Sequence, residues 1–264
     1  MKPIISFFAC LIMLTSCKKE VTENQEPGQL SIEFDNIVGA QNLQLQTGTY
    51  TNSAGELFTI DLLQYYISNI QLVKNDGSIY TIPQDSSYFL IKEAEAATHK
   101  VALNVPAGEY AGLRFVLGVD SLRSTMDITK RTGVLDPAGG MSNGMYWSWN
   151  SGYIFFKMEG SSPQAPADQN GNKKFRYHIG GFGGYSSPTI NNIKNIALDL
   201  RVAGTAKVKA GRGSNIHLFA DISKIFTGTS SISIATNPTV MFGNLSVDIA
   251  NNYAQMFRHD HTEN

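Results

Sequence analysis

Cysteine is almost absent from this chain of 264 residues, which contains only Cys10 and Cys17. Because both lie close to the N-terminus, the rest of the chain has no internal disulfides, no thiolate metal ligands and no CxxC redox motif. The stability of the folded part must therefore come from a hydrophobic core. A chain of this length is long enough for one, since domains of such size bury about three-quarters of their unfolded surface.

The sequence also lacks an excess of either charge, with 21 basic residues against 22 acidic ones. No basic stripe is present, and we expect no nucleic-acid partner. Signatures of catalysis are missing as well: there is no Gly-x-Ser-x-Gly elbow, and the glycines at 180–184 do not have the spacing of a dinucleotide-binding loop. We therefore expect a protein that is not an enzyme.

Long apolar runs are missing too, apart from the 11 residues Ile4–Leu14. That run is too short to span a bilayer but matches the core of a signal peptide, with Lys2 before it. The following Leu14–Cys17 segment resembles a bacterial lipobox, in which the cysteine is acylated. We expect residues 1–16 to be a lipoprotein signal peptide and Cys17 to be lipidated; an ordinary secretory signal is the alternative.

The polar residues 17–29 lack hydrophobic periodicity, which is typical of a flexible tether. A lipid at Cys17 would make the membrane a partner of this protein. It would place the chain in the cell envelope, anchored to the outer membrane on its periplasmic or surface face.

Short alternating segments separated by turn signals dominate residues 30–264. Asn75-Asp76-Gly77 between two apolar segments predicts a hairpin. The pattern favours one all-β, sandwich-like domain with one or two short helices. We expect helices within 121–128, 223–226 and 250–257. Strands are expected at 30–34, 57–73, 79–82, 88–91, 101–105, 113–119, 153–158, 174–179, 196–202, 216–222 and 245–249.

Histidine is the main candidate for metal chemistry, because imidazole can bind copper or zinc without any cysteine. His178 lies at the end of an expected strand, just before the glycine-rich segment, and His259 and His261 flank Asp260 near the C-terminus. His217 is expected to point away from the face that carries Ile216 and Leu218, and His99 lies in a loop segment. Spacing alone does not distinguish a metal ligand from a structural histidine.

Both tryptophans of the chain lie in one short aromatic segment. On a strand, Trp147 and Trp149 would share a face. They are core residues if buried. If exposed, they form a stacking platform for sugars or an oxidisable pair beside a metal. A glycan-binding surface lipoprotein of a polysaccharide-uptake system is therefore the alternative to a metal-binding protein.

Several blocks of the sequence, in their order along the chain, resemble the MbnP family of copper-binding proteins, which is associated with methanobactin operons. The resemblance spans roughly residues 30–261, and its most specific part is the Trp-x-Trp-x-Ser-Gly-Tyr block at 147–153. The other blocks are 58–60 with 65–72, 106–110 with 118–121, 135–137, 159–160, 177–181 and 252–257.

This resemblance implies a β-rich envelope protein that binds copper mainly through histidines. It makes His178 the first ligand candidate, followed by His261 and then His259. In methanotroph members a tryptophan near the site is oxidised to kynurenine by a dihaem peroxidase, which implies such a partner here and makes Trp147 or Trp149 the candidate residue. The resemblance thus predicts a copper-binding envelope lipoprotein with copper as its cofactor.

One departure from the family concerns the segment around Asn36, where many members have a histidine. Asn36 is a poor copper ligand compared with imidazole. A site built on His178 and His261 would therefore need a further ligand. The candidates are His259, His217, Asp35 or a water molecule.

Overall fold

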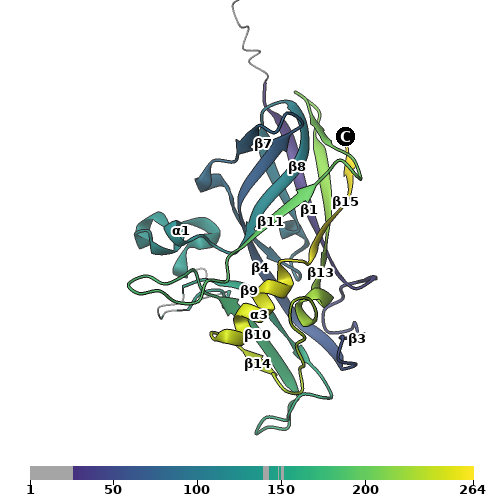
Figure 1. The fold of residues 1–264 in the computed structure, drawn as a ribbon, viewed down its shortest axis with the longest axis vertical. Coiled ribbons are helices and arrows are strands. Elements are labelled where there is room, and N and C mark those ends of the chain that lie inside the picture. Colours follow the sequence, from purple (N-terminus) through teal and green to yellow (C-terminus); the bar gives the residue numbers. More distant parts are fainter. Residues whose placement is uncertain (1–25, 139–142, 148, 150–151) are drawn as a thin grey trace, which may run out of the picture.

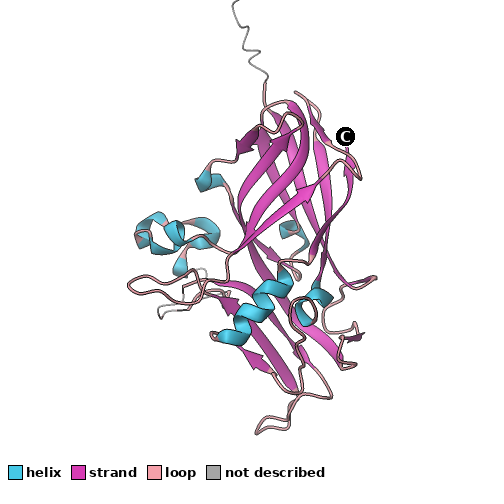
Figure 2. Ribbon diagram, viewed as in Figure 1, coloured by secondary structure: helices cyan, strands magenta, loops and turns pink. Residues whose placement is uncertain are grey.

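A computed structural model describes residues 26–138, 143–147, 149 and 152–264 of the chain. The expected signal peptide, Cys17 and most of the tether lie outside these residues. The first strand begins at Gly28, two residues before the boundary expected from the sequence. Strands make up most of the regular structure (Figure 2) and are divided between two curled sheets. The fold is all-β and sandwich-like, as the sequence predicts.

The smaller sheet joins segments from both ends of the chain. Its central strand β1 pairs in parallel with β13, and β13 pairs antiparallel with β15 (Figure 1). Strand β1 starts at the end of the molecule where β15 finishes. The five strands are β1 (Gly28–Val38), β2 (Gln41–Asn42), β7 (Lys100–Val105), β13 (Ser214–Asp221) and β15 (Phe257–Glu263).

The larger sheet is organised around the long strand β4, which pairs with β3, β5, β6, β8 and β9. The predicted hairpin at Asn75–Gly77 connects β4 to β5, and Gly77 has the positive φ that this turn requires. The ten strands are β3 (Tyr50–Thr51), β4 (Leu57–Lys74), β5 (Ile79–Thr81), β6 (Tyr88–Lys92), β8 (Gly108–Leu117), β9 (Ile154–Ser161), β10 (Lys174–Gly180), β11 (Lys194–Asp199), β12 (Ala206–Val208) and β14 (Thr239–Val240).

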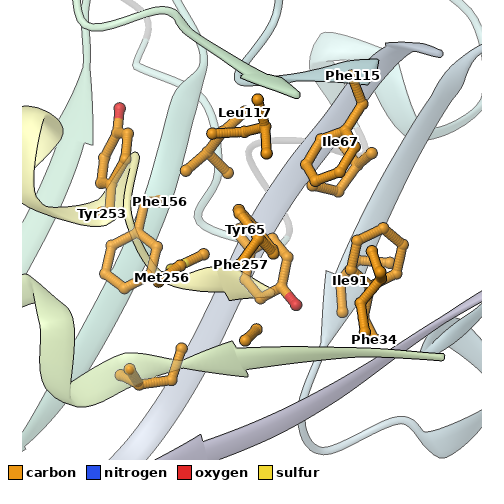
Figure 3. Packing of buried hydrophobic residues seen from close by; sticks show 14 of the residues in the cluster. Phe34, Tyr65, Ile67, Ile91, Phe115, Leu117, Phe156, Tyr253, Met256 and Phe257 are labelled. Carbon is orange, nitrogen blue, oxygen red and sulfur yellow. The ribbon is translucent and has the colours of Figure 1, made fainter. Parts of the chain in front are cut away.

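The main core lies between the two sheets. In β1, every second side chain from Leu30 to Phe34 is buried and the alternating ones face outward. Phe34, Phe115 and Phe257 pack edge to face with centroids 5.0–6.1 Å apart, and Tyr65 joins them (Figure 3). These rings come from strands of both sheets, and together they hold the sandwich closed.

A second, smaller core lies on the other face of β4. Tyr65 and Tyr66 are neighbours on this strand and both are fully buried, but they face opposite sides of the sheet. Tyr66 packs against Tyr153, Val119 and Leu135. The segment that follows β8 therefore forms a lobe over the outer face of the larger sheet, which projects from the body of the molecule at α1 (Figure 1).

Helices are few in the described part of the chain. The helix expected within 121–128 is α1 (Ser121–Thr125), and the one at 223–226 is the 3-10 helix η5 (Ile222–Phe226). The other 3-10 helices are η1 (Gln84–Ser86), η2 (Ala96–Thr98), η3 (Ile128–Lys130) and η4 (Gly133–Leu135). None of the described helices is long and apolar enough to cross a membrane.

The expected strand at 245–249 is wrong, because these residues belong to helix α3 (Asn244–Tyr253). Its buried positions 246, 249, 250 and 253 follow a helical period and pack against η5 and β10. The helix predicted over 250–257 is correspondingly displaced, since α3 ends at Tyr253 and β15 begins at Phe257. The histidines near the C-terminus therefore lie on a paired strand.

Candidate metal centre

A cluster of two histidines and an aspartate lies on the outer face of the smaller sheet. In β13, Ile216 and Leu218 are fully buried, so His217 faces outward as the alternation predicts. His217 pairs with His261 of β15, whereas Leu218 pairs with His259. Asp260 is thus the extra residue of a bulge, and bulges change the direction in which side chains point. This bulge brings Asp260 and His261 to the same face as His217.

The three side chains are close enough to share one ion. One ligand atom of each lies within 4.8 Å of the others, and the described part of the chain contains no other group of this kind. His217 Nδ1 is 3.3 Å from Asp260 Oδ2, and His261 Nδ1 is 2.8 Å from the same oxygen. The two imidazole rings stack with centroids 4.9 Å apart. Since His261 is exposed, its ring is able to turn toward a bound ion.

The electrostatics of the cluster suit a cation. The hydrogen bond to His261 lowers the pKa of Asp260, so this carboxylate is ionised at neutral pH. The same bond raises the pKa of His261. His217 Nδ1 is buried and has no hydrogen-bond partner among the described residues, although it faces the carboxylate of Asp260. A buried nitrogen without a partner is costly, and a metal ion would satisfy it.

A second carboxylate faces the other ring nitrogen of His217. Asp35 Oδ2 lies 3.7 Å from His217 Nε2, and Asp35 belongs to the neighbouring strand β1. Burial raises the pKa of Asp35, while the nearby His217 acts in the opposite direction. His217 therefore has a carboxylate near each ring nitrogen, at 3.3 Å and 3.7 Å. Metal-binding histidines commonly have this arrangement, with the outer nitrogen donating to a carboxylate.

Of the three predicted ligands, only His261 belongs to the cluster. His259 lies two residues away on β15, and its Nε2 is 2.9 Å from Thr262 Oγ1. Burial lowers the pKa of His259, and its Nδ1 has no hydrogen-bond partner among the described residues. Because the bulge separates them, His259 pairs opposite the buried Leu218 rather than beside His217.

His178 lies in the larger sheet, on β10, and is not part of the cluster. Its Nε2 is 2.8 Å from Glu159 Oε1, and Lys157 Nζ is 3.4 Å from the same oxygen. Burial lowers the pKa of His178, and the hydrogen bond to Glu159 counteracts part of this effect. The structure thus gives His178 a carboxylate partner of its own.

The tryptophans lie on the same face of β10 as His178. A side chain at Gly180 would collide with the ring of Trp147, which shows that Trp147 covers this position of the strand. Trp149 stacks on Trp147 with ring centroids 5.1 Å apart and is 51% exposed. Because Trp149 is not buried, the glycan-platform hypothesis stays a prediction. The oxidation of one tryptophan by a dihaem peroxidase also stays a prediction.

Asn36, where a family histidine was expected, has a structural role in this chain. It is buried; its Nδ2 donates to Glu93 Oε2 at 2.8 Å, and its Oδ1 accepts from the Tyr65 hydroxyl at 2.9 Å. Burial raises the pKa of Glu93. His99 Nε2 lies 3.7 Å from Glu93 Oε2, so His99 completes this polar network. The network is next to Asp35 in sequence but does not include the cluster residues.

Sequence reasoning considered His217 only as an additional ligand and gave Asp260 no role. The alternation of 216–218 was the available signal for His217. For Asp260 there was none, since its position depends on a bulge that arises only when β15 pairs with β13.

These features define a two-sheet β-protein that carries an open histidine and carboxylate cluster on its smaller sheet. The sequence model of the MbnP family matches residues 27–242, and the chain belongs to this family, which is associated with copper handling. Among solved structures, the fold is similar to MbnP from Methylosinus trichosporium, with a TM-score of 0.57 and 16% identity over 83% of this chain and 82% of that one. No curated protein matches the sequence significantly.

Proposed function

We propose that this protein is a copper-binding lipoprotein of the cell envelope, without catalytic turnover of its own, and that copper is bound by His217, His261 and Asp260. The observation that carries this proposal is the convergence of these three side chains around the buried Nδ1 of His217, which lies 3.3 Å from Asp260 Oδ2 but makes no hydrogen bond within the described residues. Family membership supports copper as the metal. Lipid attachment at Cys17 belongs to the same proposal and is based on the lipobox.

The donor set agrees with copper chemistry. Two imidazole nitrogens and one carboxylate oxygen suit Cu(II), and at a given nitrogen and oxygen site copper binds more tightly than other divalent first-row metals. Zinc also accepts this set, so the choice between the two depends on affinity. Because the cluster lies on the sheet surface, further positions around the ion remain accessible to water or to a partner's ligand.

Asp35 would orient His217 without touching the metal. With copper at Nδ1, the proton of His217 is on Nε2, where it faces Asp35 Oδ2 at 3.7 Å. Such outer carboxylates fix the ring orientation and the tautomer of the ligand, and their loss commonly costs about 10- to 100-fold in metal affinity. Asp35, which the sequence analysis considers only as a direct ligand, thus becomes the residue that orients His217.

The test is a copper titration of the soluble chain from Lys18 onward, followed by equilibrium dialysis and metal analysis. We expect one copper per chain in the unmodified protein. We expect the double variant His217→Ala/His261→Ala to lose it, and Asp260→Asn to bind more weakly by roughly tenfold or more, as for loss of one charged ligand.

His178→Ala is the matched control, since it removes a partly buried histidine that also has a carboxylate partner but lies in the other sheet. Copper should be retained in this variant. The opposite pattern, with copper lost in His178→Ala and kept in the double variant, would move the site to β10 and refute the proposed ligands.

A further inference from the structure

A cavity of about 670 Å³ lies between the projecting lobe and strand β6. None of the residues that line it belongs to the metal cluster. Its wall combines Asp85 of η1, Tyr88 of β6 and Arg123 of α1 with residues of η3 and η4. This volume is within the usual range for small-molecule sites, which is about 300–1,000 Å³. The proposed copper function leaves the cavity without a role.

The most unusual group in the wall is Arg123, because its side chain is only 6% exposed despite its charge. Its Nη2 contacts a carboxylate oxygen of Asp85, and its Nη1 donates to the carbonyl of Lys130 at 3.1 Å. The guanidinium carbon lies 4.9 Å from the centre of the Tyr88 ring. Nε of Arg123, however, is buried and has no hydrogen-bond partner among the described residues.

The unpaired Nε shows that the guanidinium of Arg123 can form one more hydrogen bond than the described residues provide. Nε and Nη2 form the edge of a guanidinium that a carboxylate can bind with two parallel hydrogen bonds. Asp85 engages Nη2 alone, which leaves half of this edge unsatisfied. Nε is shielded from solvent in the free protein, so a carboxylate that took the place of Asp85 would have to enter this edge of the guanidinium to satisfy both nitrogens.

Asp85 is well placed to give way to such a group. Its side chain is 89% exposed, so it loses little by returning to water. It lies in the short 3-10 helix η1, whereas Arg123 is held by α1, the Lys130 carbonyl and the Tyr88 ring. The arginine is thus fixed and its present carboxylate partner is the displaceable one.

The rest of the wall indicates what the ligand's body would contact. Lys130 adds a second positive charge, and Thr129 and Thr132 contribute hydroxyl groups. Met126, Val134 and Leu135 add apolar surface. The Tyr88 hydroxyl donates to Asp120 Oδ2 at 2.5 Å and accepts from Gln84 Nε2 at 3.0 Å, and it also interacts with Arg123.

We propose that this cavity binds a small organic carboxylate, whose carboxylate pairs with the Nε and Nη2 edge of Arg123 while its body rests against the apolar wall. Asp85 takes the place of that carboxylate in the free protein. The site shares no residue with the copper cluster, so either proposal can fail while the other stands.

The experiment uses isothermal titration of the soluble chain with phenylacetate and with phenylacetamide, its neutral counterpart of the same shape. We expect the carboxylate to bind at least tenfold more tightly, because a bidentate charge-assisted pair is lost with the amide. Asp85→Asn should strengthen phenylacetate binding several-fold, since it removes the competing carboxylate. Arg123→Lys, which keeps the charge but not the two-pronged edge, should weaken it by roughly tenfold or more.

Because Arg123 is buried, a loss of binding in its variant does not by itself separate ligand contact from folding, and a second readout uses the unmodified protein. In the unmodified protein, the ¹⁵N-edited Nε–H resonance of Arg123 should shift downfield as phenylacetate saturates. An unchanged resonance would overturn the proposal, as would equal binding of the acid and the amide. The proposal would also be overturned if phenylacetate bound neither the unmodified protein nor Asp85→Asn. Binding of inorganic phosphate alone would assign the cavity to phosphate and exclude the carboxylate.

Discussion

Individual residues in this protein are distinguished mainly by what surrounds them. Five histidines are equivalent in sequence terms, yet burial lowers the pKa of His178 and His259, whereas the exposed His261 has its pKa raised by Asp260. These shifts have opposite consequences for stability at acid pH. A histidine that folding keeps neutral opposes folding once the unfolded chain begins to take up protons.

His178 provides a prediction of this kind. Its folded pKa lies below the ordinary value of 6.5, so the unfolded chain binds more protons than the folded one as the pH falls below that value. The contribution of His178 to stability is therefore fully present above pH 6.5 and is lost as the pH falls through 6.5 toward the folded pKa. Urea unfolding at several pH values measures the free energy of unfolding. As the pH falls, this free energy should decrease less steeply in His178→Gln than in the unmodified protein.

His261→Gln is the contrasting variant, since the folded pKa of His261 is raised by its bond to Asp260. In His261→Gln the free energy of unfolding should decrease slightly more steeply as the pH falls than in the unmodified protein. The effect is small because His261 is exposed. Identical pH profiles for His178→Gln and the unmodified protein would show that His178 has no part in the acid response.

At the level of elements, close strand contacts depend on single glycines. Gly160 in β9 faces the bulged part of β4, where a Cβ atom would lie 2.0 Å from the Thr59 carbonyl oxygen and 2.6 Å from the Phe175 ring. The carbonyl belongs to the backbone and cannot turn aside. Gly160 is therefore required by the packing of the two strands.

Gly160→Ala should destabilise the fold by about 3 kcal/mol, because the overpacked side chain forces the backbones of β4 and β9 apart. Chemical denaturation measures this change. Gly213→Ala is the matched control, since its nearest contact would be an ordinary 3.5 Å to the Gln29 carbonyl oxygen. We expect the control to stay within about 0.5 kcal/mol. Equal unfolding free energies for the two variants would contradict the packing argument.

For the molecule as a whole, the first and last strands of the described chain lie in the smaller sheet, one on either side of β13. Strand β1 begins at Gly28, within the last two residues of the expected tether, at the same end of the molecule as the end of β15 (Figure 1). The main core contains residues from both ends of the chain, among them Phe34 and Phe257. Segments from the beginning and the end of the described chain thus close the same core.

Replacing Cys17 by alanine should abolish labelling of the protein by fatty acids when it is expressed in bacteria and release it from the membrane fraction. Thermal unfolding and copper content of the domain should be unchanged, because Cys17 precedes the first strand. Labelling that persists in Cys17→Ala would refute the lipobox interpretation and favour an ordinary secretory signal.

Much of the fold could be predicted because its signals are local. The alternation of β1, the Asn75–Gly77 hairpin and the outward direction of His217 follow from periodicity and turn chemistry. The prediction fails at 245–249, where three apolar residues alternate over too short a range to exclude a helix. Ser246 belongs to the buried face of the helix, but as a polar residue it does not count toward the hydrophobic period. Its burial is possible because its hydroxyl donates to the Gly243 carbonyl.

The sequence by itself determined the class of fold, the exclusion of thiolate chemistry and the presence of histidine as the available ligand. It did not determine which histidines meet. That was decided by the pairing of β13 with β15 and by one bulge, which turns Asp260 and His261 toward His217 and leaves His259 opposite a buried leucine. Register and bulges are set by long-range packing, and a shift of one residue moves a side chain to the other face of the sheet. Tertiary structure alone therefore decided which residues form the candidate cluster, and it likewise left one edge of the buried Arg123 half paired.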